Sequence, residues 1–331
     1  MRIPRAAWWT GFAAWTTLAS ACELCAVYNA SNVTGDSVSG FLFTISEQYL
    51  PQDTPYFEGS RIPKSILDAV RLDSSITRLV AGYNFSPAFG LNLNVPIIER
   101  QFYRYQLAPD GLHTESGTVA GLGDAALIGR WRAWRYDKMS RAITVNLLAG
   151  VKLPTGDASR IRDEINQDLA LGAIYGLGHD HFVGGAHEHD LALGSGSWDG
   201  IFGATINARW DRYFAAAQLQ YYLRTSGEAS FRFGDELMIS GGPGAYLILG
   251  QNFSLSAQAN AVYDTVAESV ALGQPSGQTG MTAWYFGPLL SFTWGRHFSG
   301  NAGVDLPLRV YEHGLQNIPS YVAHGALTWR F

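Results

Sequence analysis

The sequence predicts an all-β fold, an antiparallel transmembrane β-barrel of about twelve strands, and three observations indicate it. An export signal opens the chain, segments of alternating hydrophobicity recur to its end, and tight turns alternate with longer connections between those segments. Alternation gives each strand one face for lipid and one for a lumen, and short periplasmic turns with longer outer loops are typical of outer-membrane barrels. We therefore divide the chain into a signal peptide (1–21), a periplasmic N-terminal tail (22–40) and the barrel (41–331).

The first segment has the features of a secretory signal peptide. Arg2 and Arg5 precede an apolar stretch from Ala6 to Leu18, and small residues at 19–21 precede the expected cleavage site. The stretch is shorter than the roughly 20 apolar residues that a membrane helix needs. Later apolar runs are interrupted by polar residues before they reach that length, so we expect no membrane-spanning helix.

The two cysteines, Cys22 and Cys25, form a C-x-x-C pair at the expected start of the mature chain. A disulfide is the first interpretation, because export brings the pair into an oxidising compartment. A redox or metal-relay role is the second, since the same spacing occurs in redox motifs. Lipidation of Cys22 is the third, and it would exclude the disulfide.

Strands are expected wherever apolar and polar residues alternate. Along 143–153, for example, Ile143 and Val145 alternate with Thr144 and Asn146. The predicted strands are 41–50, 74–85, 88–99, 121–135, 140–153, 197–210, 213–226, 233–249, 252–266, 281–295, 297–311 and 320–331. The even-numbered strands are followed by tight turns and the odd-numbered strands by longer loops, which predicts the two ends of the barrel.

Aromatic residues gather at both predicted rims, where amphipathic rings favour the headgroup zone. Those near the periplasmic rim are Trp210, Tyr213, Phe253, Trp294, Trp329 and Phe331, and those near the outer rim are Tyr103, Tyr221, Tyr263, Trp284 and Tyr311. The last strand ends on Phe331, a terminal aromatic residue of the kind that the barrel-insertion machinery reads. We therefore expect outer-membrane lipid and that machinery as partners.

Composition excludes nucleic acid as a partner. The formal charge is −5, and loss of Arg2 and Arg5 with the signal peptide takes it to −7, spread without long charge runs. No catalytic residues are predicted, since nucleophilic catalysis needs a base and an orienting group beside the nucleophile and the only His-x-Ser, at 297–299, falls at a periplasmic turn. The glycine-rich 241–244 is interpreted as a bend or bulge that interrupts its strand.

Seven charged or titratable side chains on the polar strand faces are expected to line the lumen and set solute selectivity. They are Arg130, Arg132, Lys152, Arg224, Asp305, Arg309 and His324. Their mixed signs also allow a salt-bridged plug. Twelve strands lie between filled eight-stranded barrels and open 16-stranded porins, so a narrow pore and a filled barrel are both allowed.

Four histidines fall within the longest predicted loop, 154–196. They are His179, His181, His187 and His189, interspersed with acidic residues. Imidazole with carboxylate suits zinc, copper or nickel, so this loop is a candidate metal site; the alternative is a solvated polar loop that binds metal adventitiously. Otherwise we expect no cofactor.

Four segments carry a family resemblance: GLGDAALIGRWR at 121–132, GVKLPTGDASR at 150–160, LALGSGSWDGIFGATINARW at 191–210 and the long run from Arg232 to Asp264. Together they resemble the bacterial MetA-pathway phenol-degradation family over roughly residues 80–331. The resemblance implies a single outer-membrane barrel with a transport role linked to aromatic compounds.

The sequence thus predicts a porin-like protein in the outer membrane of a Gram-negative bacterium. Its expected function is passage of small solutes, aromatic or hydrophobic compounds among them, by diffusion through a narrow polar lumen. A surface receptor for zinc or copper that uses 179–190 is the alternative, and a closed structural barrel is a third. An enzyme is not expected.

Overall fold

The computed structural model describes residues 39–62, 71–108, 111–175, 187–276, 279–312 and 315–331. The predicted signal peptide, Cys22, Cys25, His179 and His181 lie outside the described residues.

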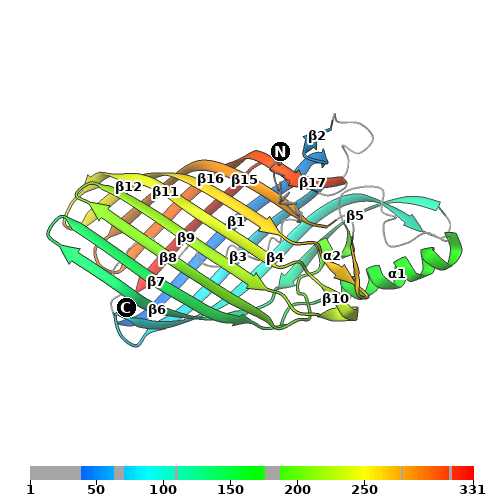
Figure 1. Cartoon of the computed structure of the whole chain (residues 1–331), viewed down its shortest axis with the longest axis horizontal. Helices are drawn as coiled ribbons and strands as arrows, with labels where there is room; N and C mark the ends of the chain where they lie inside the picture. Colours follow the sequence, from blue (N-terminus) through cyan, green and yellow to red (C-terminus); the bar gives the residue numbers. More distant parts are fainter. Residues whose placement is uncertain (1–38, 63–70, 109–110, 176–186, 277–278, 313–314) are drawn as a thin grey trace, which may run out of the picture.

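The described chain forms a closed antiparallel barrel of twelve wall strands (Figure 1). They are β1 (Gly40–Phe57), β3 (Arg71–Asn84), β4 (Phe89–Ala108), the broken strand β5 (Gly111–Leu122) and β6 (Ala126–Lys138), β7 (Arg141–Lys152), β8 (Asp199–Trp210), β9 (Tyr213–Leu223), β11 (Glu236–Leu249), β12 (Phe253–Val266), β15 (Met281–Trp294), β16 (Phe298–Glu312) and β18 (Val322–Arg330). Closure comes from β1, which pairs with β3 along one edge and with β18 along the other. The predicted fold class is confirmed.

The two ends of the barrel differ as the spacing of the strands predicts. Tight turns join β3 to β4, β6 to β7, β8 to β9, β11 to β12 and β15 to β16 at one end. The opposite end, on the right of Figure 1, carries the short elements β2 (Ser60–Arg61), α1 (Ser159–Tyr175), α2 (Glu188–Leu191), η2 (Glu228–Ser230), β10 (Phe231–Arg232), β13 (Val270–Ala271), β14 (Gln274–Pro275) and β17 (Leu315–Pro319). Short turns identify the periplasmic end, so the elaborated end is extracellular.

Side chains alternate between the two faces of the wall. On β9, Leu219 and Leu223 are exposed on the outside, while Gln218, Gln220 and Tyr222 are buried inside. The outer surface is therefore apolar, as lipid contact requires. Several aromatic residues near the turn end are also exposed on this surface: Trp210, Tyr213, Trp294, Trp329 and Phe331.

The connection from β7 to β8 is more structured than a solvated polar loop. It contains α1 and α2, and α1 buries Ile161 and Ile165 against Ala192, Phe231 and Ala271. These partners come from three separate connections, so the extracellular end has a small apolar core of its own. Among the described residues, no helix is long and apolar enough to cross a membrane.

The interpretation of 241–244 as an interruption of its strand is wrong. Strand β11 runs through it, and the pairing with β12 keeps one register from Gly241 opposite Ala261 to Gly244 opposite Gln258. Glycine is needed for a different reason. Gly241 has φ +141°, and a Cβ there would lie 2.1 Å from the Ala216 carbonyl oxygen, a separation that no real side chain shows.

Candidate functional site

A segment of the β7–β8 connection inserts into the extracellular end of the barrel. We call residues 187–197 the plug segment. Its two leucines, Leu191 and Leu193, are fully or almost fully buried. Leu191 packs on inward-facing Leu72 and Phe102, and Leu193 packs on inward-facing Leu50, Ile76 and Ile98. The loop end of the lumen is therefore partly filled by the chain itself.

Two buried arginines of β4 hold the plug segment from the side. Arg100 donates hydrogen bonds to the carbonyl oxygens of Asp190 and Ala192, the second at 2.7 Å. Arg104 pairs with Glu188 of α2 and, through Nε at 2.9 Å, with Glu115 of β5. Because charge-assisted hydrogen bonds are among the stronger polar contacts, these arginines fix both the backbone and the charge of the segment.

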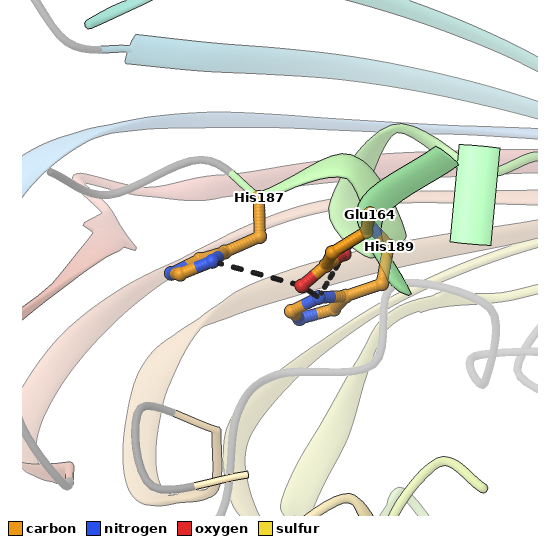
Figure 2. A group of neighbouring side chains, drawn as sticks. All are labelled: Glu164, His187 and His189. Atoms are coloured by element: carbon orange, nitrogen blue, oxygen red, sulfur yellow. Dashed lines mark hydrogen bonds and ion pairs between the residues drawn. The ribbon is translucent and has the colours of Figure 1, made fainter. Parts of the chain in front are cut away.

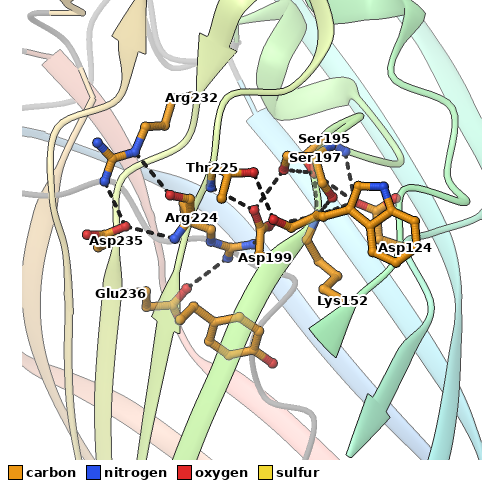
Figure 3. A network of polar contacts seen from close by, with 12 residues as sticks. Asp124, Lys152, Ser195, Ser197, Asp199, Arg224, Thr225, Arg232, Asp235 and Glu236 are labelled. Atoms are coloured by element: carbon orange, nitrogen blue, oxygen red, sulfur yellow. Dashed lines mark hydrogen bonds and ion pairs between the residues drawn. The ribbon is translucent and has the colours of Figure 1, made fainter. Parts of the chain in front are cut away.

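Below the plug segment, five charged side chains of alternating sign form what we call the lumen network: Asp124, Lys152, Asp199, Arg224 and Glu236 (Figure 3). The Lys152 ammonium lies 2.5 Å from Asp124 and 2.9 Å from Asp199. Arg224 lies 3.2 Å from Asp199 and 3.3 Å from Glu236. All five are buried, so each charge is compensated by its neighbours as burial requires.

Two serines tie the plug segment to the lumen network. The backbone N–H and the hydroxyl of Ser195 each donate to Asp124 at 2.9 Å. The Ser197 hydroxyl donates to Asp199 at 2.9 Å, and Lys152 donates to the Ser197 carbonyl oxygen at 3.3 Å. The same charges that face the lumen therefore anchor the segment that narrows it.

The segments that carry the family resemblance meet at this anchor. From the second segment, the Thr155 hydroxyl accepts a hydrogen bond from the Ala125 N–H at 2.8 Å and donates to the Gly123 carbonyl at 3.0 Å, while the Gly156 N–H donates to Asp124 at 2.9 Å. Ser195, Ser197 and Asp199 belong to the third segment and Glu236 to the fourth. Motifs that are far apart in sequence thus contribute to one network of hydrogen bonds and ion pairs.

The periplasmic half of the lumen contains a polar cavity of about 570 Å³. Its lining includes Thr144, Gln218, Ser240, Ser256, Asn260 and Ser291. A ladder of side chains on β9 connects this cavity with the lumen network. Gln218 donates to Gln220 at 3.3 Å, Gln220 donates to the Tyr222 hydroxyl at 2.7 Å, and the Arg224 guanidinium lies 4.8 Å from the Tyr222 ring centre.

Six of the seven predicted lumen residues lie on inward-facing positions. Lys152 and Arg224 belong to the lumen network. The Arg130 guanidinium donates to Asn84 at 2.9 Å, and Arg132 stands opposite inward-facing Asn146. Asp305 lies 3.0 Å from His324. All six are inside the barrel. Lys152 and Arg224 are held to neighbouring carboxylates by the ion pairs of the lumen network.

Arg309 is the exception, and its predicted lumen position is wrong. The pairing of β16 with β15 shifts by one residue, so that Trp284 opposes Arg309 while Tyr285 opposes Pro307. Such a bulge reverses which side chains face outward beyond it. Arg309 is exposed on the same face as Trp284, and its guanidinium lies 4.5 Å from the Tyr311 ring centre.

Of the four loop histidines, the structure describes His187 and His189 and brings both beside Glu164 of α1 (Figure 2). His189 Nδ1 lies 2.9 Å from each Glu164 carboxylate oxygen, and His187 Nδ1 lies 3.9 Å from the nearer one. Sequence reasoning missed Glu164, because it is 23 positions before His187 in a segment with no expected structure.

The protonation of this trio follows from its burial and its charges. Burial alone would raise the pKa of the Glu164 carboxyl, but the charge of His189 and its hydrogen bonds outweigh burial and lower that pKa to about 2. Burial first, and then the neighbouring His189, lowers the pKa of the His187 imidazole. Near neutral pH the trio therefore offers a carboxylate and a neutral imidazole.

Comparison with known proteins places the fold. No protein-family model and no curated protein matches this chain. Among solved structures, it resembles the COG4313 outer membrane channel from Pseudomonas putida F1, with a TM-score of 0.58 and 13% identity over 89% of this chain and 96% of that one. Two further structures are more distant. The beta domain of the Bordetella autotransporter Brka has a TM-score of 0.42 and 10% identity over 89% of this chain and 100% of that one. The Pseudomonas putida toluene transporter TodX has a TM-score of 0.39 and 8% identity over 95% of this chain and 96% of that one.

The fold follows from these findings taken together. A closed antiparallel wall has an apolar outer surface and a polar interior, and the first of these structures shares its fold over nearly its whole length. The described residues of this chain form an outer-membrane β-barrel of twelve strands.

Proposed function

We propose that the protein is a channel of the Gram-negative outer membrane that passes small solutes through its lumen, with the plug segment as its constriction. The observation that carries this proposal is the polar cavity of about 570 Å³ in the periplasmic half, since a barrel with a purely structural role has no need of interior space. The resemblance of fold to an outer membrane channel supports the same function.

The lining suggests which solutes the channel takes. Near the extracellular end, the wall opposite the plug segment is apolar and includes inward-facing Val266, Met281, Tyr285 and Val310. The periplasmic half is lined mostly by hydroxyl, amide and charged side chains, with Phe214 and Tyr246 among the apolar ones. A solute with an aromatic or hydrophobic body and a polar group suits both zones in turn, in agreement with the family resemblance.

Passage requires the plug segment to loosen from its anchor. At its C-terminal end, Ser195 and Ser197 hold it to Asp124, Lys152 and Asp199 through hydrogen bonds, which add to the apolar packing of its two leucines. Substitution of Lys152 by Met removes a contact to Ser197 and leaves two carboxylates facing one another. We therefore expect Lys152→Met to open the constriction.

The test is conductance of the refolded barrel in planar bilayers. The wild type should show discrete steps, and Lys152→Met should show larger or longer openings. Arg309→Met is the matched control, because it also removes a cation but from the outer surface, and its conductance should equal that of the wild type. A correctly folded wild type and Lys152→Met variant that are both silent would refute the channel.

A further inference from the structure

We propose that Glu164, His187 and His189 form a binding site for a divalent transition metal ion, zinc or copper, which locks the plug segment to helix α1. The three residues offer one ligand atom each, and these atoms all lie within 4.8 Å of one another. One carboxylate oxygen and two imidazole nitrogens are a ligand set that such ions prefer over magnesium or calcium. The proposal goes beyond solute passage, because it concerns control of the constriction.

The spacing of the ligand atoms is close to what a metal ion needs. Zinc binds imidazole nitrogen and carboxylate oxygen at about 2.0–2.2 Å, so tetrahedral geometry separates neighbouring ligand atoms by about 3.4 Å. The Glu164–His189 separation of 2.9 Å is shorter than this, and the Glu164–His187 separation of 3.9 Å is longer. Shifts of about half an ångström bring these two separations to the tetrahedral value. The separation of the two imidazole nitrogens, at most 4.8 Å, must close by up to about 1.4 Å, and water fills the fourth position.

The surroundings hold the ligands in place. The His189 backbone N–H donates to Glu164 at 2.6 Å, and the His187 backbone N–H donates to Asp190 at 2.8 Å. The two imidazole rings are stacked with their centres 5.2 Å apart. The Phe231 ring also stacks on the His189 imidazole, again with a distance of 5.2 Å between ring centres. Fixed side chains lose little freedom when an ion binds, which favours a specific site.

The charge around the trio also suits a cation. Glu188 and Asp190 flank His189 in α2, and Asp190 lies 3.4 Å from His189 Nε2. Carboxylates that contact the second nitrogen of a ligating imidazole orient it and raise its basicity. Arg104 and Arg160 compensate Glu188, so the Glu164 carboxylate is the charge that a metal ion would meet directly.

The site connects the constriction to the extracellular core. Glu164 belongs to α1, which packs on Phe231 and Ala271 through Ile161 and Ile165. His187 and His189 begin the plug segment, which continues through Leu191 to the lumen network. An ion shared between the two therefore stabilises the inserted arrangement of the plug segment and disfavours its release.

The size of the effect follows from linkage. If zinc binds only while the plug segment is inserted, free zinc at about 100 times its Kd raises the ratio of closed to open channels about 100-fold. A variant that loosens the plug segment weakens zinc binding in proportion to the fraction of chains in which the segment is no longer inserted. Lys152→Met should therefore bind zinc more weakly than the wild type, although Lys152 does not contact the ion.

The first experiment is calorimetric titration of the folded, metal-free barrel in detergent with zinc chloride, which does not depend on channel activity. We expect one ion per chain. Glu164→Gln and His187→Ala should each weaken binding at least about 10-fold, the lower range for loss of a metal-site contact. His113→Ala, an exposed histidine of β5, and the double variant His179→Ala/His181→Ala are controls and should bind as the wild type does.

Folding is checked for every variant by heat-dependent gel migration, and Glu164→Gln keeps the proposal testable should the histidine variant fail to fold. Conductance is then recorded with and without zinc chloride. Zinc should close wild-type and His113→Ala channels but not Glu164→Gln channels. Absence of zinc binding by the folded wild type, or binding that is lost in His179→Ala/His181→Ala but kept in Glu164→Gln, would overturn the site. Zinc binding by a silent barrel would refute the channel and leave the site standing.

Discussion

Lys152 and Arg309 show how the same residue class acquires different roles from position alone. Both alternate with apolar neighbours, and both are predicted to line the lumen. Lys152 is inside and held between two carboxylates, whereas the register shift in β16 turns Arg309 outward. Alternation assigns a face only as far as the next bulge, and Pro307, which has no N–H to donate to the strand pairing, is the signal for that bulge in the sequence.

Removal of the Lys152 charge should destabilise the barrel as well as open it. Lys152→Met leaves Asp124 and Asp199 buried without their common cation, and breaking a buried ion pair in this way costs about 3–5 kcal/mol. Urea unfolding in lipid vesicles, followed by tryptophan fluorescence, measures the change in free energy. Arg309→Met should change the free energy of unfolding by no more than about 1 kcal/mol, as exposed charges do. Equal losses in the two variants would contradict the network.

At the scale of elements, the wall strands follow from the sequence and the plug segment does not. Strands are visible because each face meets a different solvent, which imposes alternation along every one of them. Leu191 and Leu193 are buried by contacts with β1, β3 and β4, which lie far away in the chain. The candidate site has the same limit: His187 and His189 stand out as a cluster, but their partner Glu164 reaches them only through the packing of α1.

The glycines of β11 provide an element-scale prediction. Gly241 stands in a strand that remains continuous, and its φ of +141° together with the 2.1 Å approach to the Ala216 carbonyl oxygen leaves no room for a side chain. Gly241→Val should therefore sharply lower the fraction of chains that fold, measured by heat-dependent gel migration after refolding. Gly129→Ala in β6 is the control. A Cβ at residue 129 would meet nothing nearer than the Ala149 carbonyl oxygen at 3.5 Å, so this variant should fold normally. Normal folding of Gly241→Val would show that β11 is not so closely packed there.

At the scale of the whole molecule, one wall separates three environments. The outside is largely apolar, and the periplasmic half of the lumen is polar and hollow. The extracellular half is partly filled by the plug segment and combines an apolar wall with the buried charges of the lumen network. Outward apolar residues would be a liability in water. Their exposure is therefore intelligible only with lipid around the barrel, which gives a test of its placement.

A charge on the outer surface should cost more in the middle of the membrane than at its edge. Leu219 lies near the middle of β9 and Tyr213 at its periplasmic end, and both are exposed on the outer face. Arginine costs about 2–4 kcal/mol at the bilayer midplane and about 0–1 kcal/mol near the interface. Leu219→Arg should therefore lose about 2–4 kcal/mol of unfolding free energy in vesicles and Tyr213→Arg at most about 1 kcal/mol. Because only a bilayer has this depth profile, equal costs at the two positions would place the middle of β9 outside the hydrocarbon region.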